Sequence, residues 1–290
     1  MGAGGPRRPG GDALAALRAE LEAERAALAS ERAALAAERE DRAAERLQRD
    51  AELDVAVRIQ RSLMPRVPAR YGPWELAVLY RPARSIGGDF YDLFDLEDGG
   101  RLGATVADVT GKGLTAALVM GFARAILRSA AYNGTDAVDA LVRANAVFER
   151  DVRTGLFLSA WMATLEPDGR VRVASAGHEP ALVWRASSRR VTEVDPGGAM
   201  LGLFPRADIG ARTIRLRPGD TLVAYTDGAT DAQAPDGARF GAGRLRQAIA
   251  SHAADGPAAV IAGIDAAIAA FSPDAEHPAD DLTILAIRLG

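Results

Sequence analysis

The sequence predicts an α+β protein in which a layered sandwich with antiparallel sheets follows a long N-terminal helix. Residues 13–63 contain neither Gly nor Pro and are dense in Ala, Glu, Arg and Leu, which is the composition of a long helix. From about Trp74 onward the chain changes to short β-rich runs separated by Gly, Asp and Pro. These runs follow one another in hairpin-like succession and the helical segments are inserted in pairs, which argues against an alternating βαβ order.

The patterns place each element along the chain. Strands are expected at Glu75–Arg81, Asp89–Leu96, Arg101–Ala107, Leu156–Leu165, Val171–Ser175, Ala181–Trp184, Thr213–Leu216, Thr221–Thr226 and Leu282–Arg288. Helices of the folded domain are expected at Leu114–Ala131, Ala137–Arg150, Gly243–His252 and Ala258–Ala270.

The bulk composition narrows the class of protein. The 290-residue chain is 48% hydrophobic and 26% charged, as soluble globular proteins are. Its formal net charge of -4 argues against a general nucleic-acid-binding surface. It contains no cysteine, which excludes disulfides and thiolate chemistry. No N-terminal run resembles a signal peptide and no stretch approaches the roughly 18 apolar residues of a membrane helix. We therefore expect a cytoplasmic protein without a membrane partner.

Three segments are expected: a disordered N-terminus at residues 1–12, a helical or coiled-coil linker at residues 13–64, and one folded domain at residues 65–290. In the linker, leucine recurs every seven residues, a period typical of a left-handed coiled coil. This leucine ladder consists of Leu14, Leu21, Leu28 and Leu35. With leucine at position a, however, glutamate occupies position d, and an alanine-rich face competes with the ladder. A self-associating helix, which would make the chain a homodimer, and a solvated single helix both remain open.

The end of the linker has a second apolar pattern with a period of four residues. Its positions are Leu47, Ala51, Val55, Ile59 and Leu63. We expect this stripe to pack on the following domain. Pro65 and Pro68 should end the helix.

Four aspartates stand where an expected strand begins or ends. They are Asp89, Asp108, Asp227 and Asp280. Glycines beside them, including Gly88 and Gly228, let the backbone approach a ligand. Each aspartate alone would be read as a turn or capping residue. Four of them at strand ends predict a cation site at the rim of a sheet.

Such a carboxylate cluster has a definite chemistry. The carboxylates repel one another unless a cation balances them. Oxygen ligands without cysteine favour Mg²⁺ or Mn²⁺ over zinc. Two such ions roughly 3.5–4 Å apart can lower the pKa of a shared water and hold a phosphoryl group for in-line attack.

Five motifs occur in the order seen in a known family. They are Ser85–Asp92 (SIGGDFYD), Ala107–Gly113 (ADVTGKG), Ala174–His178 (ASAGH), Tyr225–Gly228 (YTDG) and Ala279–Thr283 (ADDLT). Over roughly Val55 to Gly290 the chain resembles the metal-dependent PPM-type (type 2C) protein phosphatases, in particular the bacterial sporulation-phosphatase (SpoIIE-like) branch. The helix end at Ile59–Pro65 is similar to the segment that enters the domain in that branch.

The resemblance implies a β-sandwich of two antiparallel sheets flanked by helices, with two divalent cations, Mn²⁺ or Mg²⁺, at one rim. Asp108 matches the carboxylate that bridges both ions, and the carbonyl of Val109 would be a further ligand. Asp227 and Asp280 match ligands of the first ion. Asp89 matches the acidic residue near the second ion. These four aspartates would be the catalytic residues.

Other residues of the motifs have weaker assignments. Lys112, in the loop before an expected helix, and Arg84, before the first metal motif, are possible phosphate contacts. His178 is expected to be structural. Asp281 occupies a place where many relatives outside the branch have Asn, which leaves its role open. Asp92 lies outside the expected ligand set, so its change to Asn should leave more activity than the loss of a ligand.

The implied activity is hydrolysis of phosphoserine or phosphothreonine on a protein by a metal-activated water, without a covalent phosphoenzyme. The implied substrates are phosphorylated anti-sigma-factor antagonists (STAS-type domains) in a bacterial partner-switching pathway. A catalytically inactive phosphatase-fold scaffold is the main alternative, disfavoured because all four metal positions are filled. Gly87–Phe90 also suggests a diguanylate cyclase, but this chain lacks the second acidic residue that the hairpin of such a cyclase carries. A nucleic-acid role is disfavoured because the arginines of the linker alternate with glutamates.

Overall fold

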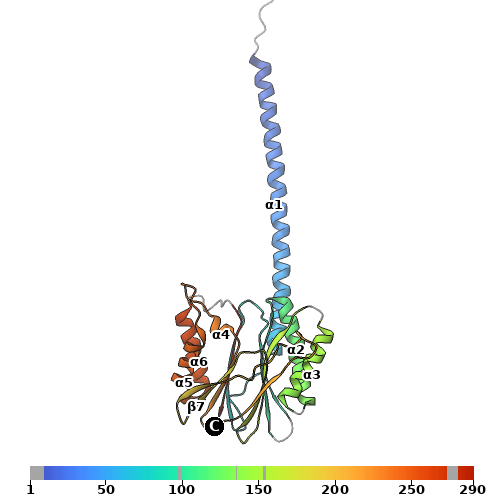
Figure 1. Cartoon of the computed structure of the whole chain (residues 1–290). Coiled ribbons are helices and arrows are strands. Elements are labelled where there is room, and N and C mark those ends of the chain that lie inside the picture. Colours follow the sequence, from blue (N-terminus) through green and yellow to red (C-terminus); the bar gives the residue numbers. More distant parts are fainter. Residues whose placement is uncertain (1–9, 97–99, 135, 153–154, 273–279) are drawn as a thin grey trace, which may run out of the picture. The chain divides into compact units, whose positions relative to one another are not determined.

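A computed structural model of the chain (Figure 1) describes residues 10–96, 100–134, 136–152, 155–272 and 280–290. The expected disordered segment therefore lies largely outside the described residues. The chain divides into two compact units, one ending at Val55 and the other comprising Ala56–Gly290. The last turns of the N-terminal helix thus belong to the same unit as the sheets.

The first unit is formed by the helix α1, Gly10–Leu63, up to Val55. Its uninterrupted course follows from the absence of Gly and Pro after position 12. The four leucines of the ladder are each about half exposed, so they present a line of apolar surface along the helix. The helix ends two residues before Pro65, whose ring cannot continue it.

The second unit is a sandwich of two antiparallel sheets, which confirms the predicted fold class. The first sheet contains, in order across it, β1 (Arg70–Tyr71), β2 (Trp74–Arg81), β11 (Leu282–Leu289), β10 (Thr221–Tyr225), β7 (Ala181–Arg185) and β8 (Arg190–Val194). The second sheet contains β3 (Phe90–Asp95), β4 (Leu102–Val109), β5 (Leu158–Leu165), β6 (Arg170–Ala176) and β9 (Gly210–Arg215).

Helices cover the outer face of each sheet (Figure 1). The helices α2 (Leu114–Asn133) and α3 (Ala137–Asp151) pack on the second sheet, and α5 (Gly241–His252) and α6 (Pro257–Phe271) pack on the first. A short helix, α4 (Gly228–Asp231), follows β10, and a 3-10 turn (Ala253–Asp255) joins α5 to α6. Apolar side chains fill three layers, one between the sheets and one under each helix pair. The central strands β5 and β10 are accordingly buried at every position.

The nine expected strands and four expected helices are all present, with ends displaced by up to three residues. The sequence reading missed β1, β8 and α4. β8 is an edge strand in which exposed positions outnumber buried ones, so it has no apolar run to mark it.

The helix α2 corrects the expectation that no apolar segment reaches membrane-spanning length. Among the described helices it alone is long and apolar enough, with a mean hydropathy of 1.4. Its residues Ala116, Met120, Ala123 and Leu127 recur at helical spacing and are buried against the second sheet. This packing accounts for the apolar residues on its inward face.

The inward face at the end of α1 also differs from the predicted stripe. Ile59 is 57% exposed, whereas Gln60 is buried and Leu63 is partly buried. Residues four apart advance about 400° around a helix, so a four-residue stripe drifts away from any single face. The partly or fully buried positions of this turn are Ala56, Val57, Gln60 and Leu63, which follow the true helical period. The predicted stripe was therefore wrong at four of its five positions, which are exposed, and only Leu63 is partly buried; the exposed positions are Leu47, Ala51, Val55 and Ile59.

Candidate metal centre

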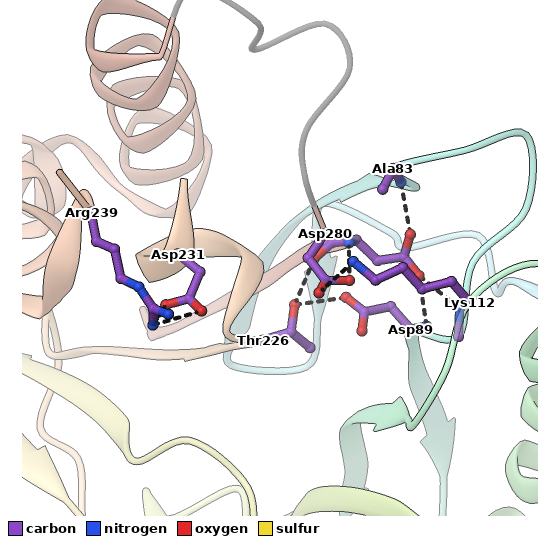
Figure 2. Close-up of polar contacts among 9 residues, drawn as sticks. Ala83, Asp89, Lys112, Thr226, Asp231, Arg239 and Asp280 are labelled. Carbon is purple, nitrogen blue, oxygen red and sulfur yellow. Dashed lines mark hydrogen bonds and ion pairs between the residues drawn. The ribbon is translucent and has the colours of Figure 1, made fainter. Parts of the chain in front are cut away.

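The antiparallel pairing of strands brings the four aspartates to one rim of the sandwich. In the second sheet, the register of β3 on β4 places Asp89 beside Asp108. In the first sheet, the register of β10 on β11 places Asp227 and Asp280 at neighbouring strand ends. Figure 2 shows the side chains of Asp89 and Asp280 on this rim, with Lys112 beside them.

Asp89 is the most enclosed of these carboxylates. Its side chain is buried, and its Oδ2 accepts hydrogen bonds from the hydroxyls of Thr226 and Thr283, each at 2.7 Å. Both threonines belong to the strand ends of the first sheet, whereas Asp89 opens a strand of the second. Figure 2 shows Thr226 facing Asp89. The rim therefore joins the two sheets through these side chains.

Burial and mutual repulsion shift the titration of the cluster. Burial, followed by the charge of Asp108, raises the pKa of Asp89 well above its usual range. Burial, followed by the charges of Asp227 and Asp280, raises the pKa of Asp108 to about 7. Burial, followed by Asp280, raises the pKa of Asp227. The common cause is that carboxylates withdrawn from water face one another, so added positive charge at the rim would favour their ionised forms.

Lys112 supplies one such positive charge. Its Nζ lies 3.0 Å from Oδ2 of Asp280 (Figure 2). Its charge offsets part of the rise in the pKa of Asp227 that burial and Asp280 cause. The ammonium group thus stands in for a cation among the carboxylates. The structure brings Lys112 to the acidic cluster itself.

The donor set fits a hard divalent cation. Among the described residues, no three Asp, Glu, His or Cys side chains converge closely enough to enclose an ion in their present conformations. The carboxylates at the rim nevertheless offer only oxygen, the donor that Mg²⁺ and Mn²⁺ prefer. The backbone at Val109 also approaches closely, because a Cβ added to Gly88 would lie 2.6 Å from the Val109 carbonyl oxygen. Glycine at position 88 therefore lets the Asp89 loop approach that carbonyl.

Two further residues hold the loop that precedes Asp89. Asp281, whose role the sequence left open, accepts hydrogen bonds from the backbone N–H groups of Ala83 (2.7 Å) and Gly88 (2.6 Å). Gln60, at the end of α1, bonds to the backbone of Gly87. The sequence reading missed Gln60, although a signal was present: it is a polar residue at an inward position of the helical period.

The remaining motif residues lie farther from the cluster. His178 is buried, its Nδ1 lies 2.7 Å from Oγ of Ser159, and its backbone N–H donates to Oγ of Ser175 at 3.2 Å. Burial lowers the pKa of His178 to about 4, which keeps the ring neutral at neutral pH. These contacts fix the loop between β6 and β7. Arg84 is exposed in the loop between β2 and β3.

Comparison with known proteins agrees with this architecture. The family model for Stage II sporulation protein E (SpoIIE) matches residues 98–290. Phosphoserine phosphatase RsbU of Bacillus subtilis is 26% identical over 188 residues, which make up 64% of this chain and 56% of RsbU. The chain spans 36% to 56% of the length of the curated relatives it matches.

Solved structures share the sandwich. The SiaA-PP2C domain of Pseudomonas aeruginosa superposes with a TM-score of 0.74 and 25% identity, over 86% of this chain and 100% of that one. RsbX in complex with magnesium superposes with a TM-score of 0.54 and 19% identity, over 75% of this chain and 96% of RsbX, a likeness that shows the fold alone.

The two sheets, their flanking helices and the aspartates at one rim define a PP2C-type serine phosphatase domain. The chain belongs to the SpoIIE family, whose model covers more than half of it.

Proposed function

We propose that the chain is a metal-dependent serine/threonine protein phosphatase that uses two divalent cations, Mn²⁺ or Mg²⁺. The observation that carries the proposal is the rim itself: Asp89, Asp108, Asp227 and Asp280 meet there from both sheets. Burial and neighbouring carboxylates raise the pKa values of Asp89 and Asp108, an arrangement that positive ions would relieve. The magnesium bound by RsbX, which shares the fold, supports the choice of metal.

Bound cations would supply an activated water as nucleophile and would neutralise charge on the phosphoryl oxygens. Asp108, which faces carboxylates on both sides, would hold both ions together with the carbonyl of Val109. Asp227 and Asp280 would hold the first ion. Asp89 would orient the second, because two threonine hydroxyls fix its Oδ2.

Two basic residues are available for the phosphate group. An ion at the rim would replace the charge that Lys112 now offers to Asp280, which would free the ammonium group for substrate. The exposed Arg84 lies in the loop that enters the Asp89 motif and would meet the phosphate from that side.

The proposed substrate is phosphoserine or phosphothreonine on a protein. The relative RsbU, named a phosphoserine phosphatase, supports this substrate class. An anti-sigma-factor antagonist of the STAS type, acting in the cytoplasm in a partner-switching pathway, is the proposed partner. Neither a nucleic acid nor a membrane is required.

We further propose that the leucine ladder of α1 pairs with that of a second copy to form a homodimer. The half-exposed leucines at a seven-residue period support this pairing. Light scattering on the full chain should give twice the monomer mass, and a chain beginning at Val55 should give the monomer mass. A monomeric mass for both would exclude the coiled coil.

Phosphate release from a phosphoserine protein and from a generic phosphate ester, measured across a Mn²⁺ titration, tests the activity. The parent should release phosphate with Mn²⁺ and none in excess chelator. The matched control is Asp231→Asn, because Asp231 lies near the rim but pairs with Arg239 at 2.9 Å (Figure 2). Asp108→Asn should lose more than about 100-fold in rate, whereas Asp231→Asn should stay within a few-fold of the parent. No release with Mn²⁺, or undiminished release in chelator, would overturn the proposal and favour a scaffold role.

A further inference from the structure

The backbone that leads into Asp89 is held by a side chain from α1. The Nε2 of Gln60 donates a hydrogen bond to the carbonyl of Gly87 at 2.7 Å, and the N–H of Gly87 donates back to Oε1 of Gln60 at 3.2 Å. One amide therefore satisfies both polar groups of a single backbone residue. Gln60 and Gly87 are both buried, so water has little access to replace this pair.

Asp281 holds the same segment from another side. Its Oδ2 accepts hydrogen bonds from the N–H groups of Gly88 at 2.6 Å and Asp89 at 3.4 Å. A Cβ added to Gly87 would lie 2.2 Å from that oxygen, so a larger residue at position 87 would displace the carboxylate. The segment 87–89 is thus clamped between Gln60 and Asp281.

The clamp determines where the carboxylate of Asp89 can point. Its Oδ2 is already bound by the hydroxyls of Thr226 and Thr283. Asp89 also lies close enough to Asp108, the central carboxylate of the rim, for the charge of Asp108 to raise the pKa of Asp89. With the side chain oriented in this way, the backbone position at residues 87–88 sets the separation between Asp89 and Asp108.

We propose that Gln60 is a positioning residue for the second metal: it acts through Gly87 to hold Asp89 and thereby ties the last turns of α1 to the metal rim. This inference rests on the proposed two-metal function. Without the amide, the N–H and carbonyl of Gly87 lose their partners in a buried place, and the segment must shift to recover hydrogen bonds. Mutation of a residue that supports a metal ligand typically weakens metal binding by about 10–100-fold.

The test compares Gln60→Met with Gln48→Met. Both variants make the same chemical change on the same helix, but Gln48 is exposed and bonds only to the exposed Glu52 at 3.1 Å among the contacts described. The readout is the signal of free Mn²⁺ in electron paramagnetic resonance. Subtracting free from total Mn²⁺ gives the number of bound ions, and no catalytic reaction is needed. For Gln60→Met, the weaker of the two Mn²⁺ dissociation constants should rise about 10–100-fold, with a smaller change in the stronger. Gln48→Met should match the parent.

A phosphate-release assay then separates positioning from loss of structure. At saturating Mn²⁺, kcat of Gln60→Met should return to within a few-fold of the parent, because all four rim carboxylates are still present and excess Mn²⁺ fills the weakened second site. If circular dichroism shows that Gln60→Met does not fold, Gln60→Asn replaces it and should show the same defect, since its shorter amide cannot reach both groups of Gly87. Unchanged Mn²⁺ affinity in a folded Gln60 variant, with the parent binding two ions, overturns the positioning role and leaves the proposed function intact. A parent that binds no Mn²⁺ overturns the proposed function itself.

Discussion

Asp92 lies on β3, three residues after Asp89, but its carboxylate serves a different purpose. It is 2% exposed and is bound by two arginines of α2. Arg124 donates from Nη2 to Oδ1 at 3.0 Å, and Arg128 donates from Nε to Oδ2 at 2.8 Å and from Nη2 to Oδ1. The change Asp92→Asn would remove the buried negative charge and leave two guanidinium groups facing β3 without it.

The expected cost follows from the exposure of the two arginines. Breaking a buried ion pair by removing one partner costs about 3–5 kcal/mol, because the remaining charge stays buried. The side chain of Arg124 is 13% exposed and that of Arg128 is 31% exposed, so water can hydrate Arg128 in part. We therefore expect Asp92→Asn to lower the free energy of unfolding by about 3 kcal/mol, which corresponds to a fall in Tm of roughly 6–12 °C for a domain of this size.

Urea and thermal unfolding followed by circular dichroism, in excess chelator, measure this loss. The control is Glu193→Gln, which breaks an ion pair with Arg246 whose side chains are each 42% exposed and should cost about 1 kcal/mol or less. Because Asp92 pairs with α2, the folded fraction of Asp92→Asn should keep nearly the activity of the parent. A free energy of unfolding within about 1 kcal/mol of the parent would refute the reasoning.

Three other outcomes are expected. Asp108→Asn should be nearly inactive at any Mn²⁺ concentration in the phosphate-release assay, whereas high Mn²⁺ should partly rescue Asp89→Asn; equal rescue of both would contradict a bridging Asp108. Lys112→Met should tighten Mn²⁺ binding up to about five-fold in calorimetry, because an exposed ion pair contributes up to about 1 kcal/mol; weaker binding would show that the ammonium does not compete with the ion. Burial lowers the pKa of His178 to about 4, against 6.5 for a histidine exposed to water, so its stabilising contribution is present above pH 6.5 and is lost as the pH falls toward 4. His178→Gln should therefore lose up to about 3 kcal/mol of pH dependence between those values in urea titrations, and parallel curves for parent and variant would contradict it.

The strands were predictable where burial on both faces requires a continuous run of apolar residues. β5 and β10, covered on both faces, are continuous apolar runs and were found within two residues of their observed ends. β8 was missed because an edge strand with one face in water needs no such run. The sequence did not mark α2 as long and apolar enough to cross a membrane. The helix nevertheless reaches that length and hydropathy because most of its residues are apolar.

For the candidate site, the sequence indicated which carboxylates lie at the rim but not which residues hold them in place. Acidic residues at strand ends mark a rim whichever sheet they come from, so the four aspartates could be chosen before their register was known. The partners of Asp89 could not, because Thr226 and Thr283 are separated from it by 137 and 194 positions and meet it only through tertiary packing. The same limit explains why the predicted stripe included Ile59 and not its neighbour Gln60. Hydrophobicity identifies a buried face but cannot show that a buried amide has a backbone partner.

The outer edges of the two sheets have a consequence for how the protein behaves in solution. Among the described strands, β8 and β9 each pair on one side only, and both carry exposed arginines, Arg190 on the former and Arg212 and Arg215 on the latter. If two copies are tethered through α1, their sandwiches experience a local concentration on the millimolar scale, at which open strand edges tend to fuse. Pairing of these edges would require their charged side chains to give up water, so the tether can bring the two domains together without favouring fusion of the strands.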